Sequence, residues 1–339
     1  MNVSWKRALA AQYTTIALRF ALGCLVFSCS QKLDAGSTAP RGKLPVDSRN
    51  PILITNDGPS DNWQGEYAVL LANGGGPELA GIVVSASAPW PVLDSNVAGW
   101  RELVSAARSA GLSGVPDPIA SVSNVLRRPA SGQIEDTVPN RSEGARFIVD
   151  TSSRLALPYR PLVITTGGRL TDIADAYLLD PTLTERVVVV SSLGTVSDSG
   201  GAMGPPNGEL DPWADAIVAS RFRYIQVSAY YDQLVDVPDS RLAELPANAF
   251  GQWILAKQPT ILDLHEAADQ VSVLAVDLPS FAVGVERVSP SGLVGPSANA
   301  GPSLARSADG KAWLVTAGAS ALATARFWEL LLDPKTFEH

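Results

Sequence analysis

The sequence predicts an α/β protein with an open, mostly parallel β-sheet that is covered by helices on both faces. Three observations lead to this prediction. Short runs of β-branched and other apolar residues recur along the chain, they are continuous rather than alternating, and helical patterns separate them. A continuous apolar run is typical of a parallel strand buried on both faces. Strands that alternate with helices build open parallel sheets.

The elements follow the order of these runs. The predicted strands are residues 52–55, 81–85, 162–165, 187–191, 224–227 and 313–316, and the predicted helices are residues 67–72, 99–110, 170–179, 212–220 and 320–332. The clearest helix is 170–179, because its apolar residues recur at i, i+3, i+4, i+7 and i+8 and form one face. We predict a surface loop over 116–142 and a hairpin or irregular crossover over 284–310, where Pro, Ser and Gly are frequent.

The composition excludes several classes of protein. The chain has 339 residues, 46% of them hydrophobic and 18% charged, which is typical of a globular domain. Its net charge of −8, without a basic run, argues against sequence-independent binding of nucleic acid. Two cysteines and two histidines are too few for a disulfide scaffold or a histidine-rich metal cluster. No uncharged apolar run reaches about 18 residues, so we expect no membrane-spanning helix.

The first 28 residues resemble a bacterial signal peptide of the lipoprotein type. Lys6, Arg7 and Arg19 precede a short apolar run, 20–28, and no acidic residue occurs in this region. The run ends at Cys29, and a small residue directly before a cysteine is typical of the lipoprotein signal. Cys29 is therefore the predicted first residue of the mature chain.

This resemblance implies an exported protein, periplasmic or at the cell surface, that contacts a bacterial membrane only through its lipid anchor. Residues 29–50 would form a flexible tether, and residues 51–339 the α/β domain. Cys24 is a second candidate for the lipidated residue. An ordinary secretory signal and a buried helix are the alternatives for 1–28.

The first predicted strand leads into the oxygen-rich loop Thr55-Asn56-Asp57-Gly58-Pro59-Ser60-Asp61-Asn62. Open α/β sheets bind ligands at the carboxyl ends of their strands, and carboxylate and amide oxygens suit a hard cation such as Ca²⁺. The same residue types are the usual turn formers. The loop alone therefore leaves a cation site and a simple turn open.

The third predicted strand leads into Thr165-Thr166-Gly167-Gly168-Arg169-Leu170-Thr171-Asp172, at the start of a predicted helix. Its glycines allow the backbone to approach a ligand closely, and the helix start offers free N–H groups. The segment lacks both Gly-Lys-Ser/Thr and GxGxxG, so it is neither a Walker loop nor a dinucleotide fingerprint.

Taken together, these segments resemble the inosine/uridine-preferring nucleoside hydrolase family. The family's Asp-x-Asp-Pro-Gly-x-Asp-Asp motif is similar in register to 55–62, and its Thr-Gly-Pro-Leu-Thr-Asn motif is similar to 166–172 with one extra residue. The strand at 187–194, the Asn-x-x-x-Asp-Pro-x-Ala pattern beginning at Asn207, and a late aspartate at Asp269 follow in the family's order. The resemblance implies the family's α/β fold and hydrolysis of nucleosides or related ribosides.

The resemblance also implies roles for individual residues. The calcium ligands would be Asp57, Asn62, the Thr166 carbonyl and Asp269, and Asp57 would be the general base that activates water. Two further residues, Asp61 and Asn207, would bind ribose hydroxyls. Cleavage of an N-glycosidic bond passes through an oxocarbenium-like sugar, and a metal-held water and a nearby base suit that chemistry.

The chain departs from the family at several of these positions. Asn62 stands where the family has a bidentate aspartate, which removes one charge from the metal site. Pro205 replaces a glutamate, and Ser87-Ala88 replaces a Gly-Asn pair that contacts ribose. The leaving-group histidine has no match, because Ala268 precedes Asp269 and His265 lies three residues earlier. If the alignment slips there, Glu266 replaces Asp269 as the late ligand.

Three hypotheses of different classes follow. The first is an exported, calcium-dependent hydrolase of N-glycosidic bonds, slowed by these replacements. The second is a tethered protein that binds nucleosides or sugars in the same pocket without turnover, and the third is a structural α/β domain. Trp63, Trp90, Tyr230 and Tyr231 are candidates for stacking on a base, although most aromatics in such a domain are core residues. A homo-oligomer is compatible with all three hypotheses.

Overall fold

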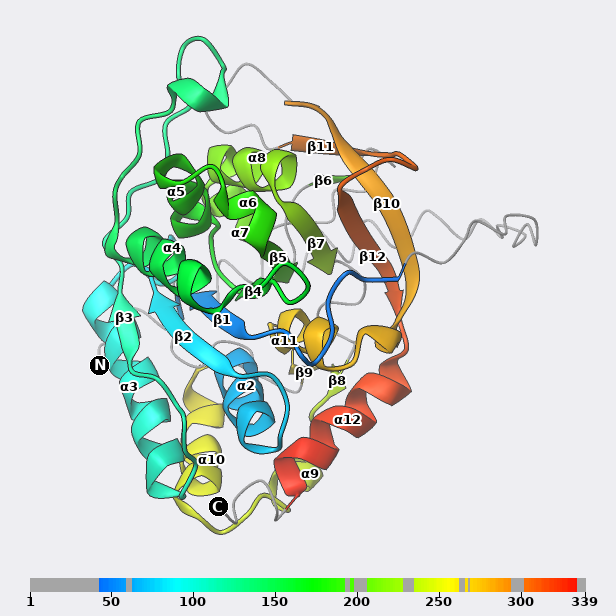
Figure 1. Cartoon of the computed structure of the whole chain (residues 1–339). Helices are drawn as coiled ribbons and strands as arrows, with labels where there is room; N and C mark the ends of the chain where they lie inside the picture. Colours follow the sequence, from blue (N-terminus) through cyan, green and yellow to red (C-terminus); the bar gives the residue numbers. More distant parts are fainter. Residues whose placement is uncertain are drawn as a thin grey trace, which may run out of the picture. The chain divides into compact units, whose positions relative to one another are not determined.

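The computed structural model describes residues 43–58, 63–192, 196–197, 206–227, 235–261, 266–267, 269–293 and 302–333 (Figure 1). The predicted signal peptide and Cys29 lie outside these residues. The end of the predicted tether lies within them, and Leu44 and Val46 are buried in the core. The Asn50 side chain donates a hydrogen bond of 2.8 Å to the Pro161 carbonyl. The last residues of the predicted tether therefore pack against the α/β domain.

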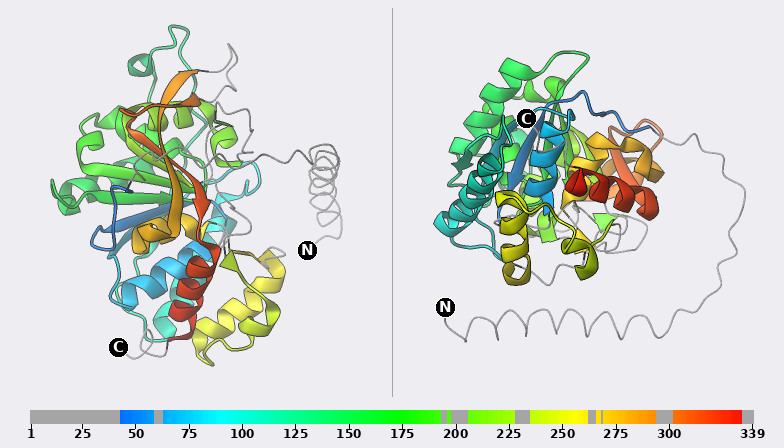
Figure 2. Two further views of the ribbon diagram at one scale, coloured as in Figure 1. Left: turned by 90° about the vertical axis from the view of Figure 1, so that its right-hand side faces the viewer. Right: turned by 90° about the horizontal axis from the view of Figure 1, so that it is seen from below.

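One sheet runs through the domain (Figures 1 and 2). Among the described residues it has ten strands, in the order β3 (Pro118–Ala120), β2 (Leu79–Val84), β1 (Ile52–Asn56), β4 (Leu162–Thr166), β5 (Val187–Ser192), β7 (Arg223–Val227), β12 (Ala312–Gly318), β10 (Ala282–Leu293), β11 (Pro302–Arg306) and β6 (Val196–Ser197). The seven strands from β3 to β12 are parallel, and β10 is antiparallel to both of its neighbours. This confirms the predicted open, mostly parallel sheet.

Helices cover both faces of the sheet, as predicted. One core lies under α2 (Gln64–Asn73), α3 (Leu93–Ser109), α10 (Ala249–Ile261), α11 (Gln270–Asp277) and α12 (Ser320–Leu332), and the other under α4 (Glu143–Leu155), α5 (Thr171–Leu179) and α8 (Pro212–Arg221). Successive strand residues alternate between the two cores: Ile54 belongs to the first and Leu53 to the second. This alternation explains the continuous apolar runs, because both faces of each strand are buried.

The smaller elements complete the described chain. They are α6 (Leu183–Arg186), α7 (Pro206–Leu210), α9 (Asp239–Leu242), two 3-10 turns (Ile134–Asp136 and Pro279–Phe281), and a separate two-stranded pair of β8 (Val235–Asp236) with β9 (Glu266–Ala267). No helix in the described ranges has the length and hydrophobicity needed to cross a membrane.

Several elements differ from the sequence prediction, which named no helix at α4, α10 or α11. The predicted loop 116–142 contains the three-residue strand β3, which is too short to show a pattern of its own. Helix α4 was not predicted, because its buried face has only one large apolar residue, Ile148, among small residues such as Gly144 and Ala145. Residues 284–310 were predicted to form either a hairpin or an irregular crossover. The antiparallel pairing of β10 with β11 shows that they form a hairpin.

The buried carboxylate of Asp277 in α11 bonds to side chains of two other helices, α2 and α12. Tyr67 of α2 donates a hydrogen bond of 2.7 Å to Asp277 at the end of α11, and Arg326 of α12 forms a bidentate pair with the same carboxylate at 2.7 and 3.1 Å. The side chain of Asp277 is only 6% exposed. The Tyr67 ring stacks on Phe327, which closes the contact between α2 and α12.

Replacing Arg326 by methionine should destabilise the domain by about 2 kcal/mol, because the buried carboxylate of Asp277 would keep only the hydroxyl of Tyr67 as a partner. Urea unfolding followed by circular dichroism measures this loss. The matched control is Arg306→Met, which breaks the more exposed pair of Arg306 with Glu286 and should cost less than about 1 kcal/mol. Equal losses in the two variants would contradict the prediction.

Candidate active site

The candidate site lies where the strand order of the sheet reverses direction. From β1 the chain proceeds to β2 and β3 on one side, and from β4 it proceeds to β5 and β7 on the other. The crossovers therefore leave the β1–β4 pair in opposite directions, and open α/β sheets bind ligands at the carboxyl ends of the strands at such a point. β1 ends at Asn56 and is followed by Asp57-Gly58, and β4 is followed by Gly167-Gly168.

Asp57 follows β1 and is 3% exposed. The Gly58 N–H donates to its carboxylate at 2.8 Å, and the hydroxyl of Ser87 donates a second hydrogen bond. Burial raises the pKa of the Asp57 carboxyl group, while the bonds from Ser87 and Gly58 and the charge of Arg169 lower it. The carboxylate is thus held by neighbours that favour its ionised form against the cost of burial.

The turn after β4 brings a second carboxylate beside Asp57. A Cβ atom on Gly167 would lie 2.6 Å from Oδ2 of Asp269 and 2.5 Å from Nδ2 of Asn56. A Cβ atom on Gly168 would lie 3.3 Å from Cγ of Asp57. Asp57 and Asp269 therefore lie against adjacent residues of one turn, although 212 positions separate them in the sequence. Only glycine allows this approach at position 167.

Asp269 is fully buried at the start of α11. The hydroxyl of Ser192, the last residue of β5, donates to its Oδ1 at 2.5 Å and lies 3.3 Å from the Thr166 carbonyl oxygen. Asn207 donates a hydrogen bond of 2.6 Å to the Ser192 carbonyl. Ser192 thus links Asp269, the Thr166 carbonyl and Asn207 in one cluster.

Four of the six predicted site residues are therefore brought together: Asp57, Thr166, Asn207 and Asp269. The other two, Asp61 and Asn62, lie outside the described residues, as do Pro205 and His265. The alternative late ligand, Glu266, pairs with Asp236 in the small β8–β9 sheet. Asp269 is the late acidic residue that contacts the turn after β4.

The sequence prediction missed four polar residues that support these side chains. They are Asn56, Gln64, Ser87 and Ser192, all of them buried. Three of them end a strand or follow one within three positions, so a search for polar residues at the ends of apolar runs could have found them. Gln64 offers no such signal, because it lies inside α2.

Of the aromatic residues that were candidates for stacking on a base, one lies in the core and one is partly exposed. Trp63 is buried and packs edge-on against Phe327 at 5.4 Å, so it is a core residue. Trp90 is partly exposed, and its backbone N–H donates to the hydroxyl of Ser87 at 3.3 Å. Since Ser87 also bonds to Asp57, the backbone of Trp90 is connected to the carboxylate through Ser87. The two tyrosines, 230 and 231, lie outside the described residues.

The acidic residues of the Asn207 motif and of α5 have a structural role. Asp211 caps α8 by accepting the Ala214 N–H at 3.1 Å, and its other oxygen accepts the Thr171 hydroxyl at 2.6 Å. The Ser142 hydroxyl lies 2.8 Å from a carboxylate oxygen of each of Asp172 and Asp175 on α5. These bonds join α5, α8 and the start of α4 behind the site.

Asp215, one turn after Asp211 in α8, is 1% exposed, and neither of its carboxylate oxygens accepts a hydrogen bond within the described part of the chain. Burial, with a smaller contribution from the charge of Asp211, raises the pKa of Asp215 well above its usual value of 3.8. The folded chain therefore holds the proton of Asp215 to a higher pH than the unfolded chain does.

Asp215→Asn should stabilise the protein, and the gain should grow as the pH rises from about 4 to 8. The proton on Asp215 stabilises the wild type fully below the unfolded pKa, and this contribution is lost as the pH approaches the folded pKa. Asparagine is neutral throughout, so it avoids the loss. Melting temperatures of both proteins at several pH values test this, with the exposed Asp150→Asn as control; a constant difference across pH would contradict it.

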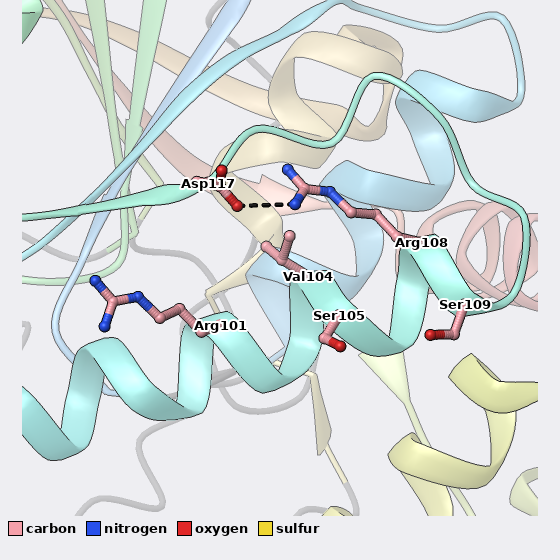
Figure 3. A pocket seen from close by; sticks show the side chains of 6 residues that line it. All are labelled: Arg101, Val104, Ser105, Arg108, Ser109 and Asp117. Carbon is pink, nitrogen blue, oxygen red and sulfur yellow. Dashed lines mark hydrogen bonds and ion pairs between the residues drawn. The ribbon is translucent and has the colours of Figure 1, made fainter.

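A shallow surface hollow lies on α3, away from the carboxyl ends of β1 and β4 (Figure 3). It is lined by Arg101, Val104, Ser105, Arg108, Ser109 and Asp117. Arg108 binds Asp117 at 2.8 Å and also donates to the Val115 carbonyl, so its guanidinium is already engaged. The hollow contains none of the predicted site residues.

The donor set at the site is made of oxygen atoms. Asp57 and Asp269 supply carboxylates and Thr166 a backbone carbonyl, which are the ligand types that Ca²⁺ prefers. Among the described residues, no three His, Cys, Asp or Glu side chains come together as a metal-binding group. The predicted ligand set includes only two carboxylates, those of Asp57 and Asp269, so it does not require such a group of three. Because all of its ligands are oxygen atoms, a hard cation fits the chemistry of the site.

No protein-family model matches the sequence, and no curated protein matches it by sequence. Solved structures do match the fold. A plant nucleoside hydrolase aligns with a TM-score of 0.60 and 12% identity over 84% of this chain and 100% of its own. An inosine–guanosine nucleoside hydrolase gives 0.60 and 13% over 83% and 98%, and the inosine–uridine preferring enzyme from Bacillus anthracis gives 0.55 and 15% over 85% and 99%.

These structures confirm the predicted fold. The alignments cover more than four fifths of this chain and nearly all of each matched protein, so the whole domain has the nucleoside hydrolase fold. At 12–15% identity the likeness concerns the fold. Activity must be argued from the residues of the site.

Proposed function

We propose that this protein hydrolyses the N-glycosidic bond of nucleosides or related ribosides, with Ca²⁺ bound by Asp57, the Thr166 carbonyl, Asp269 and Asn62. The observation that carries the proposal is the meeting of Asp57 and Asp269 at the β4 turn, at the point where the strand order reverses. Ligands bind at this point in open α/β sheets. The named activities of the structures with the same fold support the reaction class.

Different residues of the site have different roles in this hydrolysis. Asp57 accepts the proton of the attacking water, because it is a buried carboxylate with only part of its hydrogen-bonding capacity used. Asp269 is held in one orientation by Ser192. Asp61 and Asn207 bind ribose hydroxyls. When bound, Ca²⁺ supplies charge that orients the water and the ribose and lowers the pKa of the water.

Trp90 is the residue proposed to contact the base. It is partly exposed beside Ser87, which in turn contacts Asp57. An indole ring at the rim of such a site offers a flat apolar surface to a purine or pyrimidine. This contact positions the base whether or not the bond is cleaved.

Binding without turnover is the second candidate function. The specific observation that favours it is the hydrogen bonding of Asp57, whose carboxylate already accepts bonds from Ser87 and Gly58 and so has fewer lone pairs left for a water. Pro205 and Asn62 each remove a carboxylate from the positions that the family uses. A binding protein would retain affinity for a nucleoside and release no ribose.

Two measurements on the wild type decide among these functions. Calcium in the millimolar range should raise the melting temperature, because only the folded state holds the ligand set together. Ribose release from inosine and uridine in the same buffer should be slow but above the rate without protein. Calcium binding without ribose release supports the binding protein. No effect of calcium would remove the metal from the proposal.

Asn62→Asp should bind calcium about tenfold more tightly than the wild type, because it restores a carboxylate and a bidentate contact. Two carboxylates balance the charge of Ca²⁺ without excess, so the wild type should bind with a Kd of about 10⁻⁴–10⁻³ M, as extracellular sites do. Calorimetric titration measures both values. Gln133→Glu, which adds the same charge at an exposed position, should leave the Kd unchanged; an equal gain there would indicate a general effect of charge.

We also propose that the protein is exported and anchored by a lipid on Cys29. The basis is the sequence of residues 1–29. An exterior location suits a weak calcium site, because extracellular calcium is far more abundant than cytosolic calcium.

A further inference from the structure

A continuous chain of hydrogen bonds connects the backbone of Asp57 to the backbone of Asp269. The Asp57 N–H donates to Oδ1 of Asn56 at 2.6 Å, and Nδ2 of Asn56 donates to Oε1 of Gln64 at 2.7 Å. Nε2 of Gln64 donates to the hydroxyl of Ser272 at 2.9 Å, and that hydroxyl donates to the Asp269 carbonyl at 2.8 Å. Every donor in this chain points the same way, from Asp57 toward Asp269.

The three intermediate residues are shielded from water. Asn56 is 2% exposed, and Gln64 and Ser272 are fully buried. Their amides and hydroxyl cannot exchange partners with solvent, so breaking one link leaves a buried polar group unsatisfied. Asn56 also packs against the Gly167 backbone beside Asp269. The chain of bonds thus connects the end of β1 to α2 and to the start of α11.

We infer that Gln64 is a positioning residue, which sets the separation of Asp57 and Asp269 so that both can reach one cation. The inference rests on the proposed function. Glutamine is suited to this place because one side chain must accept from Asn56 and donate to Ser272 at once. A site whose ligands are spaced before the ion arrives loses less entropy on binding, so Gln64 contributes to calcium affinity without touching the ion.

The competing explanation is that these bonds only fasten α2 to α11. Gln64→Met distinguishes the two, because it keeps the length of the side chain and removes both of its hydrogen bonds. The matched control is Tyr67→Phe on the same helix, which removes the bond to Asp277 at the far end of α11. Both variants should lower the melting temperature without calcium. Only Gln64→Met should weaken calcium binding, by about tenfold.

A double-mutant cycle sharpens the test. Ser272→Ala removes the last two bonds of the chain, the one from Gln64 and the one to the Asp269 carbonyl, so it should also weaken calcium binding about tenfold. The double variant Gln64→Met, Ser272→Ala should bind calcium no more weakly than either single variant. Calcium chloride is titrated into each folded protein by calorimetry. If Gln64→Met does not fold, the comparison of Ser272→Ala with Tyr67→Phe decides.

The outcomes separate this inference from the proposed function. If the wild type binds calcium and the Gln64 and Ser272 variants bind it equally well, the positioning role is wrong and the proposed function stands. If the variants weaken binding independently, so that their effects multiply, the connected chain is wrong. If the wild type itself binds no calcium, the metal site fails, and the positioning role fails with it.

Discussion

Ribose release should fall by about a thousandfold in Asp57→Asn, measured with inosine and uridine in millimolar calcium. A positioned general base contributes roughly 10²–10⁴-fold to a rate, and asparagine cannot accept the proton of the attacking water. The same change removes one of the two described charges of the metal site. The amide is nearly isosteric with the carboxylate, and it avoids a buried charge, so the variant should fold at least as stably as the wild type.

The control for this experiment is Asp150→Asn, an exposed carboxylate on α4, which should leave ribose release unchanged. Calcium affinity measured on Asp57→Asn separates its two proposed roles. A loss of turnover at saturating calcium reports the base, and a loss of affinity reports the ligand. Turnover at the wild-type rate in Asp57→Asn would show that Asp57 is not the base.

Gly167→Ala should abolish calcium binding at millimolar concentrations. The added methyl group would lie 2.6 Å from Oδ2 of Asp269 and 2.5 Å from Nδ2 of Asn56, well inside contact distance. Asp269 or the β4 turn must then move, and a loss of stability of about 1–3 kcal/mol is expected for such overpacking. Melting temperature and calorimetric titration measure the two effects.

Gly81→Ala is the matched control, because its methyl group would lie 2.4 Å from the Phe147 ring, far from the two carboxylates. It should destabilise the domain by a similar amount and leave calcium affinity unchanged. Comparing the two variants thus distinguishes the effect of overpacking elsewhere in the domain from the effect of overpacking at the metal site. Equal calcium affinity in both would show that the turn after β4 is not part of the metal site.

The sheet could be predicted from the sequence because burial on both faces leaves a continuous apolar run in each central strand. Val187 to Val190 is the clearest case: its four valines alternate between the two cores and need no other signal. Helix α4 escaped prediction for the opposite reason. Its buried face has one large apolar residue, Ile148, among Gly144, Ala145, Thr151 and Ser152, so no row of large apolar residues marks it in the sequence.

The candidate site was predictable only where a residue has a fixed place in a motif. Asp57, Thr166 and Asp269 could be named because motif spacing survives in this chain. Ser192 and Gln64 could not, because their roles depend on which strand and which helix lie next to each other. Residue 192 reaches residue 269 only after the chain has folded, and no local pattern records such a contact.

The strand order has a consequence for the biosynthesis of the protein. β12 is the last strand to be made, yet it lies between β7 and β10. Until residue 318 has left the ribosome, β7 has an unpaired edge, and the β10–β11 hairpin is not paired with β7 through β12. An open edge of this kind invites pairing with other chains. A nascent chain stalled near residue 311 should therefore be a target for chaperones and proteases, even though nearly all of the site residues have already been synthesised.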